Sequence, residues 1–355
     1  MASLIERLRK ASTVDAEILT KSQTIQAKDV VSTPVPGLNI ALSGSISGGL
    51  TPGLTIFAGP SKHFKSLYSL ICASSYLKAH PDAVCIFYDN EFGSPVSYFT
   101  SAGIDPERVL HSPIADWEQL IHDASVQLAE LKRGDKVVIV VDSIGNLASK
   151  KEITDALNGD EKADMTRAKR AKSFFRIVTP QLTMKDIPMI VIAHTYDTLE
   201  MYSKKVVSGG TGAYYSADNI FIIGRAQEKE GTGAKAELTG YEFKINIEKS
   251  RFVREKSVVP ITVKFDGGIQ RWSGLFDIAL TTGLIKKIDG SKSYQVVGHE
   301  SFGEFARAEV ENSSKFWRQV ITETDFPDRV EREFKVSSGK LITEDNTSPD
   351  DNDEE

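Results

Sequence analysis

The chain reads LTIFAGPSKHFKS from Leu54 to Ser66, and the predicted core is arranged around this stretch. Its first five residues form a short apolar run that is typical of a strand buried on both faces. A polar loop follows, and the segment from Ser66 to Ala79 has the pattern of a helix. This order of strand, loop and helix is that of a phosphate-binding P-loop, in which backbone N–H groups and a helix N-terminus face an anion.

The candidate phosphate-binding residues are those of the loop and the first helical turn. They are Gly59, Pro60, Ser61, Lys62, His63, Phe64, Lys65 and Ser66. In such a loop the lysine reaches the β- and γ-phosphates of a nucleotide, and the serine hydroxyl is a ligand of Mg²⁺.

One position departs from the usual pattern, G-x-x-x-x-G-K-[ST], because Phe64 stands where a glycine is expected. We expect a side chain here to restrict the residue to negative φ, so that the loop closes by a route that needs no glycine. Taken alone, the stretch is also compatible with an ordinary buried strand and turn.

The composition is that of a soluble globular protein. The 355 residues, 40% of them apolar, can form one large α/β core with appendages or two smaller domains. Cys72 and Cys85 lie in apolar segments and are expected to be buried thiols in a reducing compartment. No signal-peptide core and no apolar stretch near the roughly 18 residues of a membrane span is present, so we expect a cytoplasmic protein without a membrane partner.

The net charge of −6 argues at first against a nucleic-acid partner. However, the chain from Leu341 onward holds seven acidic residues and no basic one. The body of the protein without this tail is nearly neutral, so the objection is weak.

The chain divides into four predicted parts. Residues 1–30 form an arm, in which Ser3 and Glu6 make the capping box of a short amphipathic helix, and which is either frayed or docked on a neighbouring subunit. Residues 31–270 form the core, 271–336 a small mixed C-terminal region, and 337–355 an acidic disordered tail.

Within the core, the sequence predicts a mostly parallel sheet covered by helices on both faces. A turn-rich approach at 34–53 precedes the P-loop strand, and apolar runs recur at 83–88, 137–141, 189–193 and 219–223 with amphipathic segments between them. Alternating runs at 241–247 and 258–265 predict antiparallel strands at one edge.

Three polar residues follow predicted strands at the carboxyl edge of this sheet. Asp142 ends the run VVIVVD and has the place of a Walker B carboxylate, which holds Mg²⁺ directly or through water. Glu91 is positioned to orient or deprotonate an attacking water, or is a solvated turn residue. His194 is positioned to hydrogen-bond a γ-phosphate, or is structural.

Two predicted loops on the same edge combine cations with glycines. The first, 149–164, leads into a helix with several basic residues, and the second is 195–212. Their candidate residues for contact with a nucleic-acid backbone, which the resemblance described below assigns to DNA, are Arg167, Lys169, Arg170, Tyr202, Lys204, Lys205, Gly209 and Gly210. They suit mobile loops that fold on a phosphate backbone, although plain solvated loops are the alternative.

These segments together resemble the RecA family of strand-exchange recombinases, and within it the UvsX-type recombinases of T4-like phages. The resemblance covers roughly residues 1–280, includes the phenylalanine of the P-loop, and rests on GPSKHFKS, FYDNEFG, AGIDPERV, VDSIGNLASKKE, DMTRAKR, FRIVTP, AHTYDT, GGTG, YSAD and VKFDGGI. It implies a RecA-like P-loop core and a DNA-dependent ATPase that uses ATP and Mg²⁺. Such a protein forms helical filaments on single-stranded DNA, pairs them with double-stranded DNA, and exchanges strands in recombination, repair and replication.

The resemblance also implies roles for single residues. Lys65 and Ser66 match the family's P-loop, Glu91 its catalytic glutamate, Tyr98 the aromatic that stacks on adenine, and Asp142 its Walker B acid. His194 stands where bacterial RecA has a glutamine that senses the γ-phosphate. Lys249 and Arg251 stand where the family has two lysines that reach a neighbour's ATP, and the arginine keeps the charge.

The same resemblance implies partners and leaves alternatives. Recombination mediators and single-strand-binding proteins are expected partners, and a phage-encoded protein would act in the host cytoplasm. A ring helicase shares this core, and an accessory paralogue would bind ATP and DNA without significant turnover. The acidic tail is either an electrostatic competitor for DNA, a landing site for basic proteins, or only solubilising.

Overall fold

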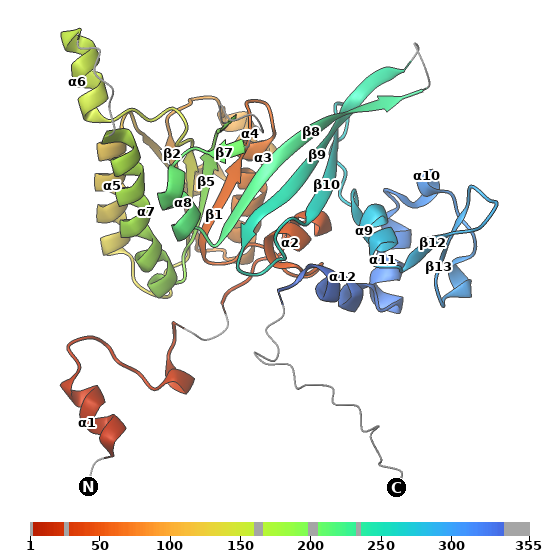
Figure 1. Ribbon diagram of the computed structural model, residues 1–355, viewed down its shortest axis with the longest axis horizontal. Coiled ribbons are helices and arrows are strands. Elements are labelled where there is room, and N and C mark those ends of the chain that lie inside the picture. Colours follow the sequence, from red (N-terminus) through yellow and green to blue (C-terminus); the bar gives the residue numbers. More distant parts are fainter. Residues whose placement is uncertain (1–2, 25–27, 160–165, 198–204, 232–235, 337–355) are drawn as a thin grey trace, which may run out of the picture.

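The computed structural model describes residues 3–24, 28–159, 166–197, 205–231 and 236–336 (Figure 1). In this part of the chain, nine strands form one sheet in the order β11-β10-β9-β8-β1-β5-β4-β2-β3. The strands from β8 to β3 in this order run parallel, whereas β9, β10 and β11 are antiparallel to their neighbours. The predicted parallel sheet with an antiparallel edge is therefore confirmed.

The P-loop strand β1 lies in the middle of the sheet, between β5 and β8. The sheet strands are β1 (Gly53–Ala58), β2 (Val84–Asp89), β3 (Val109–Pro113), β4 (Val137–Asp142), β5 (Pro188–Ala193), β8 (Asn219–Glu230), β9 (Glu237–Ser250), β10 (Val258–Lys264) and β11 (Gly268–Ile269). All residues of β1, β4 and β5 are buried, which explains their unbroken apolar sequences.

Helices cover both faces of the sheet. The helices of the core are α2 (Pro36–Ser43), α3 (Lys65–Ala79), α4 (Val96–Ser101), α5 (Trp117–Glu130), α6 (Lys150–Asn158), α7 (Thr166–Lys185) and α8 (Gly210–Ser216). The side chains of α5 and α7 pack in one apolar cluster on the first face, and those of α2 and α3 pack in a second cluster on the other face.

The approach to the P-loop strand, predicted as turns, contains the buried helix α2, so this prediction is wrong for Pro36–Ser43. Proline at the first turn and Gly44 in the left-handed region after the last turn are positions that helices accept. The Asn39 side chain bonds backbone groups of Thr33 and Ile46, which secures the turns around the helix.

The two predicted loops contain regular structure. Residues 150–158 are the helix α6, capped by Ser149 and Glu152, so the prediction of a loop is wrong there. The second segment holds the short hairpin of β6 (Thr195–Asp197) and β7 (Lys205–Val207), and α8 begins at Gly210. Tyr202 and Lys204, like residues 160–165, lie outside the described residues.

The strand predicted at 219–223 continues to Glu230, and its partner β9 is likewise longer than predicted. Together β8 and β9 project beyond the sheet as a ribbon (Figure 1). Most ribbon residues past Ile223 are partly or fully exposed, so backbone pairing rather than apolar burial sustains this extension.

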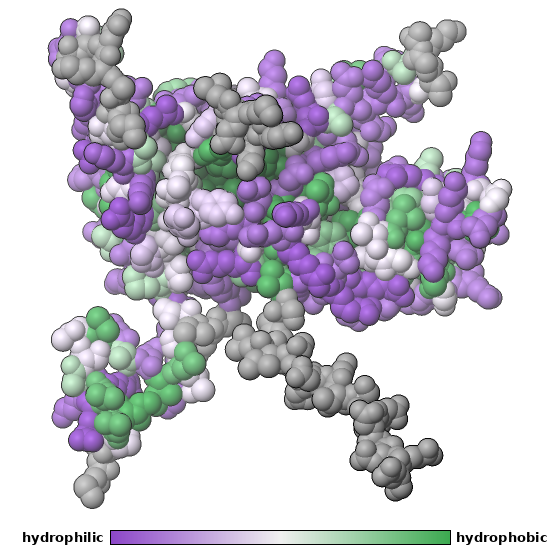
Figure 2. Space-filling view, viewed as in Figure 1, coloured by the Kyte–Doolittle hydropathy of each residue, from purple (hydrophilic) through white to green (hydrophobic). Residues whose placement is uncertain are grey.

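The N-terminal arm is the helix α1 (Leu4–Ala11) followed by a short 3₁₀ turn, Leu19–Lys21. The predicted capping box of Ser3 and Glu6 is present. None of the residues of α1 is buried, and Figure 2 shows apolar side chains gathered on the arm, where Leu4, Ile5 and Leu8 are exposed.

The C-terminal region packs against the α2 face of the core. It consists of α9 (Leu275–Thr281), β12 (Ile285–Lys287), β13 (Tyr294–Val296), α10 (Arg307–Val310), α11 (Ser314–Glu323) and α12 (Phe326–Phe334). Its buried Trp317 and Phe326 belong to the same apolar cluster as α2 and α3.

Both cysteines are buried free thiols, as expected. Among the described helices none is both long and apolar enough to cross a bilayer.

Candidate nucleotide site

The P-loop follows β1 and wraps the start of α3, as the sequence predicts. Gly59 permits a close approach to β8, because a Cβ at this position would lie 3.1 Å from the Ile223 carbonyl oxygen. The Lys65 ammonium is buried and donates to the Pro60 carbonyl oxygen at 2.7 Å. Burial lowers the pKa of Lys65, and the carboxylates of Glu91 and Asp142 oppose this effect.

The expectation that Phe64 has a negative φ is wrong. Its φ is 61°, in the left-handed region that a glycine would occupy, and Lys62 also has a φ of 61°. This conformation costs a non-glycine residue roughly 1–2 kcal/mol. The Phe64 ring packs on Phe243 with centroids 4.8 Å apart and meets the Tyr68 ring edge-on, so apolar contact offsets the strain.

A cavity of about 740 Å³ opens beside this loop. It is lined by the loop residues 61–66 together with Glu91, Tyr98, His194 and Ile269. A space of this size holds a small organic ligand. Tyr98 is 54% exposed on α4, so its ring is available to a ligand in the cavity.

Asp142 ends β4 and reaches the start of α3. Its Oδ2 accepts from the Ser66 hydroxyl at 2.8 Å, and its Oδ1 is buried without a hydrogen-bond partner among the described residues. Burial raises the pKa of Asp142 to about 6. A carboxylate oxygen without a partner beside a hydroxyl fits a hard cation such as Mg²⁺, which takes few protein ligands and completes its shell with phosphates and water.

Glu91 lies in a hydrogen-bonded cluster with His194 and Ser143. Its Oε1 is 2.8 Å from His194 Nε2 and accepts from the Ser143 hydroxyl at 2.5 Å. The His194 contact, followed by that of Ser143, outweighs burial and lowers the pKa of Glu91 to about 2. Gly145 makes room for this arrangement, because a Cβ there would lie 1.9 Å from His194 Cδ2.

The sequence placed Glu91 at this edge but did not reveal the groups that hold it. Asp89 Oδ1 accepts from the backbone N–H groups of Glu91 and Phe92, and Asn90 Oδ1 accepts from the Ser143 N–H. The contact between the strand ends follows from the register in which Asp89 pairs with Asp142 in adjacent parallel strands. In the sequence, the only indication of these hydrogen-bond partners is that two apolar strands end in polar residues.

A second cavity, of about 390 Å³, lies beside the candidate DNA-binding segments. Arg167, Gly209 and Gly210 line it together with residues of β6, and His194 lines it as well. His194 thus faces both cavities. Its backbone N–H bonds the Ser208 hydroxyl, and its carbonyl accepts from the Ser208 N–H, so the histidine is tied to the segment before α8.

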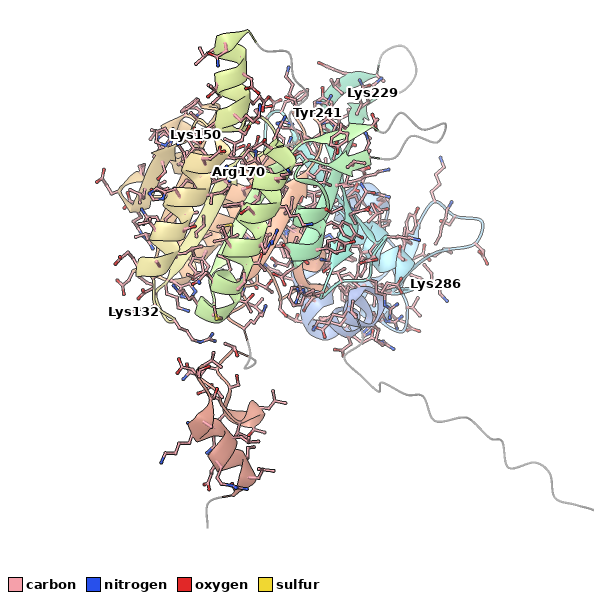
Figure 3. All side chains as sticks on the ribbon, turned by 60° about the vertical axis from the view of Figure 1, so that its left-hand side comes forward. Lys132, Lys150, Arg170, Lys229, Tyr241 and Lys286 are labelled. Atoms are coloured by element: carbon pink, nitrogen blue, oxygen red, sulfur yellow. The ribbon has the colours of Figure 1, made fainter. Side chains whose placement is uncertain are left out.

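The candidate DNA-binding cations occupy different settings. Arg167 donates to the Gly145 carbonyl oxygen, and Arg170 pairs with Glu118 at 2.8 Å. Lys169 is exposed on α7, and Lys205 lies 3.4 Å from Asp197 in the β6–β7 hairpin. Figure 3 shows Arg170 on α7 and Lys150 at the base of α6, toward the same end of the molecule as the ribbon residues Lys229 and Tyr241.

Lys249 and Arg251 lie far from the P-loop of their own chain. Lys249 pairs with Ile220 at the start of β8, and Arg251 bonds Asp218, whereas the P-loop begins at the opposite end of β1. The Lys249 ammonium donates to the carbonyls of Tyr214 and Ala217. In their own chain these two cations thus lie at the end of the sheet opposite the P-loop.

Comparisons with known proteins identify relatives of this chain. No protein-family model matches the chain. The RecA protein of Chloroherpeton thalassium is 26% identical over 324 residues, which cover 89% of this chain and 87% of that protein. The recombination and repair protein of phage T4 is 50% identical over 346 residues, which cover 95% of this chain and 87% of that protein. The chain belongs to the RecA family.

Membership of the RecA family confirms the main predictions from the sequence. The chain is a phage-type recombinase with the RecA-like α/β fold, and RecA-family recombinases are DNA-dependent ATPases that catalyse strand exchange. Members bind ATP and DNA and assemble into filaments. The ring helicase and the non-hydrolysing paralogue are accordingly disfavoured for this RecA-family chain.

Proposed function

We propose that this RecA-family chain binds ATP and Mg²⁺ in the cavity beside the P-loop and couples hydrolysis to the DNA-binding segments through His194. The observation that carries the proposal is that His194 lines both cavities and contacts Glu91 at 2.8 Å. One side chain thus joins the hydrolytic carboxylate to the segment that begins at Thr195.

The P-loop and the polar residues at the strand ends bind ATP and Mg²⁺ before hydrolysis. Backbone N–H groups of the loop and the Lys65 ammonium would hold the phosphates, Ser66 and Asp142 would hold Mg²⁺, and Tyr98 would stack on the base. Bound Mg²⁺ would neutralise charge on the β- and γ-phosphates. Lys65 leaves the Pro60 carbonyl for a phosphate oxygen, which is a stronger, charge-assisted partner.

Glu91 orients the attacking water. The transition state of phosphoryl transfer is loose, so the water needs alignment more than early deprotonation. A carboxylate whose pKa is about 2 stays ionised and accepts a hydrogen bond from this water. The water oxygen attacks the γ-phosphorus while the bond between the γ-phosphorus and the β,γ-bridging oxygen breaks. The proton of the water passes to the released phosphate, and ADP and phosphate leave.

His194 transmits the state of the γ-phosphate to DNA. With ATP bound, its imidazole is shared between Glu91 and the γ-phosphate, and its backbone holds Ser208 in the segment before Gly209 and Gly210. We expect this to hold the described residues 195–197 and 205–212 on single-stranded DNA, together with Arg167, Lys169 and Arg170 at the start of α7.

Lys249 and Arg251 act on the neighbouring protomer in a helical filament. They lie at the amino edge of the sheet, opposite their own P-loop. We expect them to exchange their present partners, the Tyr214 and Ala217 carbonyls and Asp218, for the nucleotide of a second copy packed head to tail. The exposed apolar face of α1 also docks on a neighbouring protomer, because α1 buries none of its residues on its own chain.

The proposed process includes further partners. The filament pairs with double-stranded DNA. Mediator proteins load the filament on single-stranded DNA, and single-strand-binding proteins compete with it for the same DNA. We place its action on DNA in the host cytoplasm. The acidic tail, residues 337–355, lies outside the described residues. It competes with DNA, recruits basic proteins or only solubilises the chain.

Steady-state ATP hydrolysis, measured with and without single-stranded DNA and combined with negative-stain microscopy of the same samples, tests this proposal. Strong stimulation by DNA together with helical filaments is the expected result. Closed rings would favour a helicase, and filaments without turnover would favour an accessory paralogue; either result would overturn the proposal.

A further inference from the structure

The P-loop of this chain holds two non-glycine residues in the left-handed region, Lys62 and Phe64, each with a φ of 61°. Side chains rarely adopt this conformation, and a glycine adopts it without strain. The loop sequence therefore does not by itself favour the shape that the loop has. Lys62 contacts Arg225 of β8, and Phe64 contacts Phe243 of β9.

Phe64 makes an aromatic contact with β9. Its ring centroid lies 4.8 Å from that of Phe243, with the planes inclined by 30°. Phe243 is itself buried, with 1% of its surface exposed, so it cannot yield without disturbing the core. The backbone of residue 64 sets the direction of its ring, so we expect a change of its φ to move the ring off Phe243.

The backbone of Lys62 is bound by Arg225 of β8. The Arg225 guanidinium donates to the Lys62 carbonyl oxygen at 3.3 Å and lies over the Tyr241 ring, 4.6 Å from its centroid. The Tyr241 ring in turn lies 6.2 Å from that of Phe243. Figure 3 shows Tyr241 on the ribbon, near Lys229.

We propose that Arg225, Tyr241 and Phe243 form a brace that sets the shape of the P-loop in place of the missing glycine. They are positioning residues, because they hold the loop through Lys62 and Phe64 and do not line the nucleotide cavity. The inference rests on the proposed assignment of that cavity to ATP. It makes ATP affinity depend on two strands outside the loop.

The physical reason lies in the direction of the loop N–H groups. Without the Phe243 contact, the Phe64 backbone gains by leaving the left-handed region, and its neighbouring N–H groups then turn away from the phosphates. A glycine at 64 meets the same backbone shape without outside support. The brace should therefore matter for ATP binding when residue 64 is phenylalanine and lose its importance when residue 64 is glycine.

A double-mutant cycle on the full-length chain tests the brace. Phe243→Leu keeps an apolar side chain but removes the ring, and it is made in the natural chain and in a Phe64→Gly chain. Ile245→Val, a conservative change at the next buried position on the same face of β9, is the matched control. The readouts are KM and kcat for DNA-stimulated ATP hydrolysis, equilibrium binding of a fluorescent ATP analogue, and Tm.

In the natural chain, Phe243→Leu should raise KM for ATP and the analogue's Kd about tenfold, with kcat changed less than about twofold. In the Phe64→Gly chain the same substitution should change KM less than about twofold, and Ile245→Val should have little effect in either chain. Arg225→Ala should also raise KM in the natural chain, and Arg225→Lys should rescue it only partly, because lysine lacks the planar fork that stacks on Tyr241.

An equal rise of KM in both chains would show a general packing defect and overturn the brace, as would an unchanged KM in the natural chain. Failure of the unaltered protein to bind the ATP analogue would instead contradict the proposed nucleotide site. The two failures are thus distinguishable.

Discussion

Nε2 of His194 lies 2.8 Å from Oε1 of Glu91, although the two residues are 103 positions apart in the chain. Glu91 follows β2, and His194 follows β5. The parallel sheet brings both strand ends to one edge, where Ser143 from the end of β4 completes the cluster. One imidazole thereby connects a carboxylate beside the P-loop with the hairpin that begins at Thr195.

This connection predicts that His194 carries the effect of ATP on DNA affinity. Such coupling between two sites typically amounts to about 5- to 150-fold. For His194→Ala, we expect single-stranded DNA affinities with a non-hydrolysable ATP analogue and with ADP to agree within about twofold. His194→Gln, which retains a hydrogen-bonding group, should keep part of the coupling. Fluorescence anisotropy at one fixed salt concentration measures these affinities. An alanine variant that keeps the full difference in affinity would show that His194 does not carry the coupling.

Asp142 predicts a pH-dependent cost in stability. Its pKa is raised from 3.8 to about 6 in the folded chain, so ionisation disfavours the folded state. This penalty is absent below pH 3.8 and grows as the pH rises through about 6. In Mg²⁺-free buffer, Asp142→Asn should therefore stabilise the protein by on the order of 2 kcal/mol at about pH 8.

The gain from Asp142→Asn should disappear near pH 4, and Mg²⁺ with ADP should narrow the difference at high pH by stabilising only the natural chain. Thermal unfolding of both proteins across this pH range measures the effect. A stability gain that does not change with pH would contradict the assignment of the penalty to the ionised Asp142 carboxylate.

The position of Arg251 predicts a shared active site. Lys65→Ala removes the P-loop cation, and Arg251→Ala removes the cation offered to a neighbour, so each variant alone should lose at least about 100-fold in turnover. A random equimolar mixture should recover up to about a quarter of the natural rate, because that fraction of interfaces pairs an intact P-loop with an intact Arg251. Arg251→Lys serves as the charge-preserving control, and Tm verifies that Asp218 tolerates the loss of its partner.

A mixture that hydrolyses ATP no faster than the two variants separately would show that Arg251 does not act across protomers. DNA binding by each variant must be established first, so that the mixture contains joint filaments.

The sequence predicts what is local. The run LTIFA and the residues Lys65 and Ser66 specify a strand and a helix start by their own pattern, and both occur as predicted. The left-handed Phe64 was not predictable in this way, because its conformation depends on Phe243, which reaches it only through the pairing of β8 with β9. A local rule for φ fails where a distant contact outweighs its cost.

The helix α2 was missed although its signals were present. Pro36 stands in the first turn and Gly44 directly after the last, which is the order that helices favour. The abundance of glycine, proline and serine around it directed the interpretation toward turns. In the candidate site, the partners of Glu91 were not predictable, because Ser143 and His194 meet it only through the order and register of β2, β4 and β5.

The turnover of Glu91→Gln on single-stranded DNA tests whether Glu91 takes part in ATP hydrolysis. Glutamine keeps the size of the side chain but not the charge that orients the water, so ATP-dependent filaments should form normally while kcat falls at least about 100-fold. Glu107→Gln, at an exposed carboxylate outside the cavity, is the control and should hydrolyse ATP at the natural rate. A Glu91→Gln protein that hydrolyses ATP normally would contradict the account, because Glu91 would then have no part in catalysis.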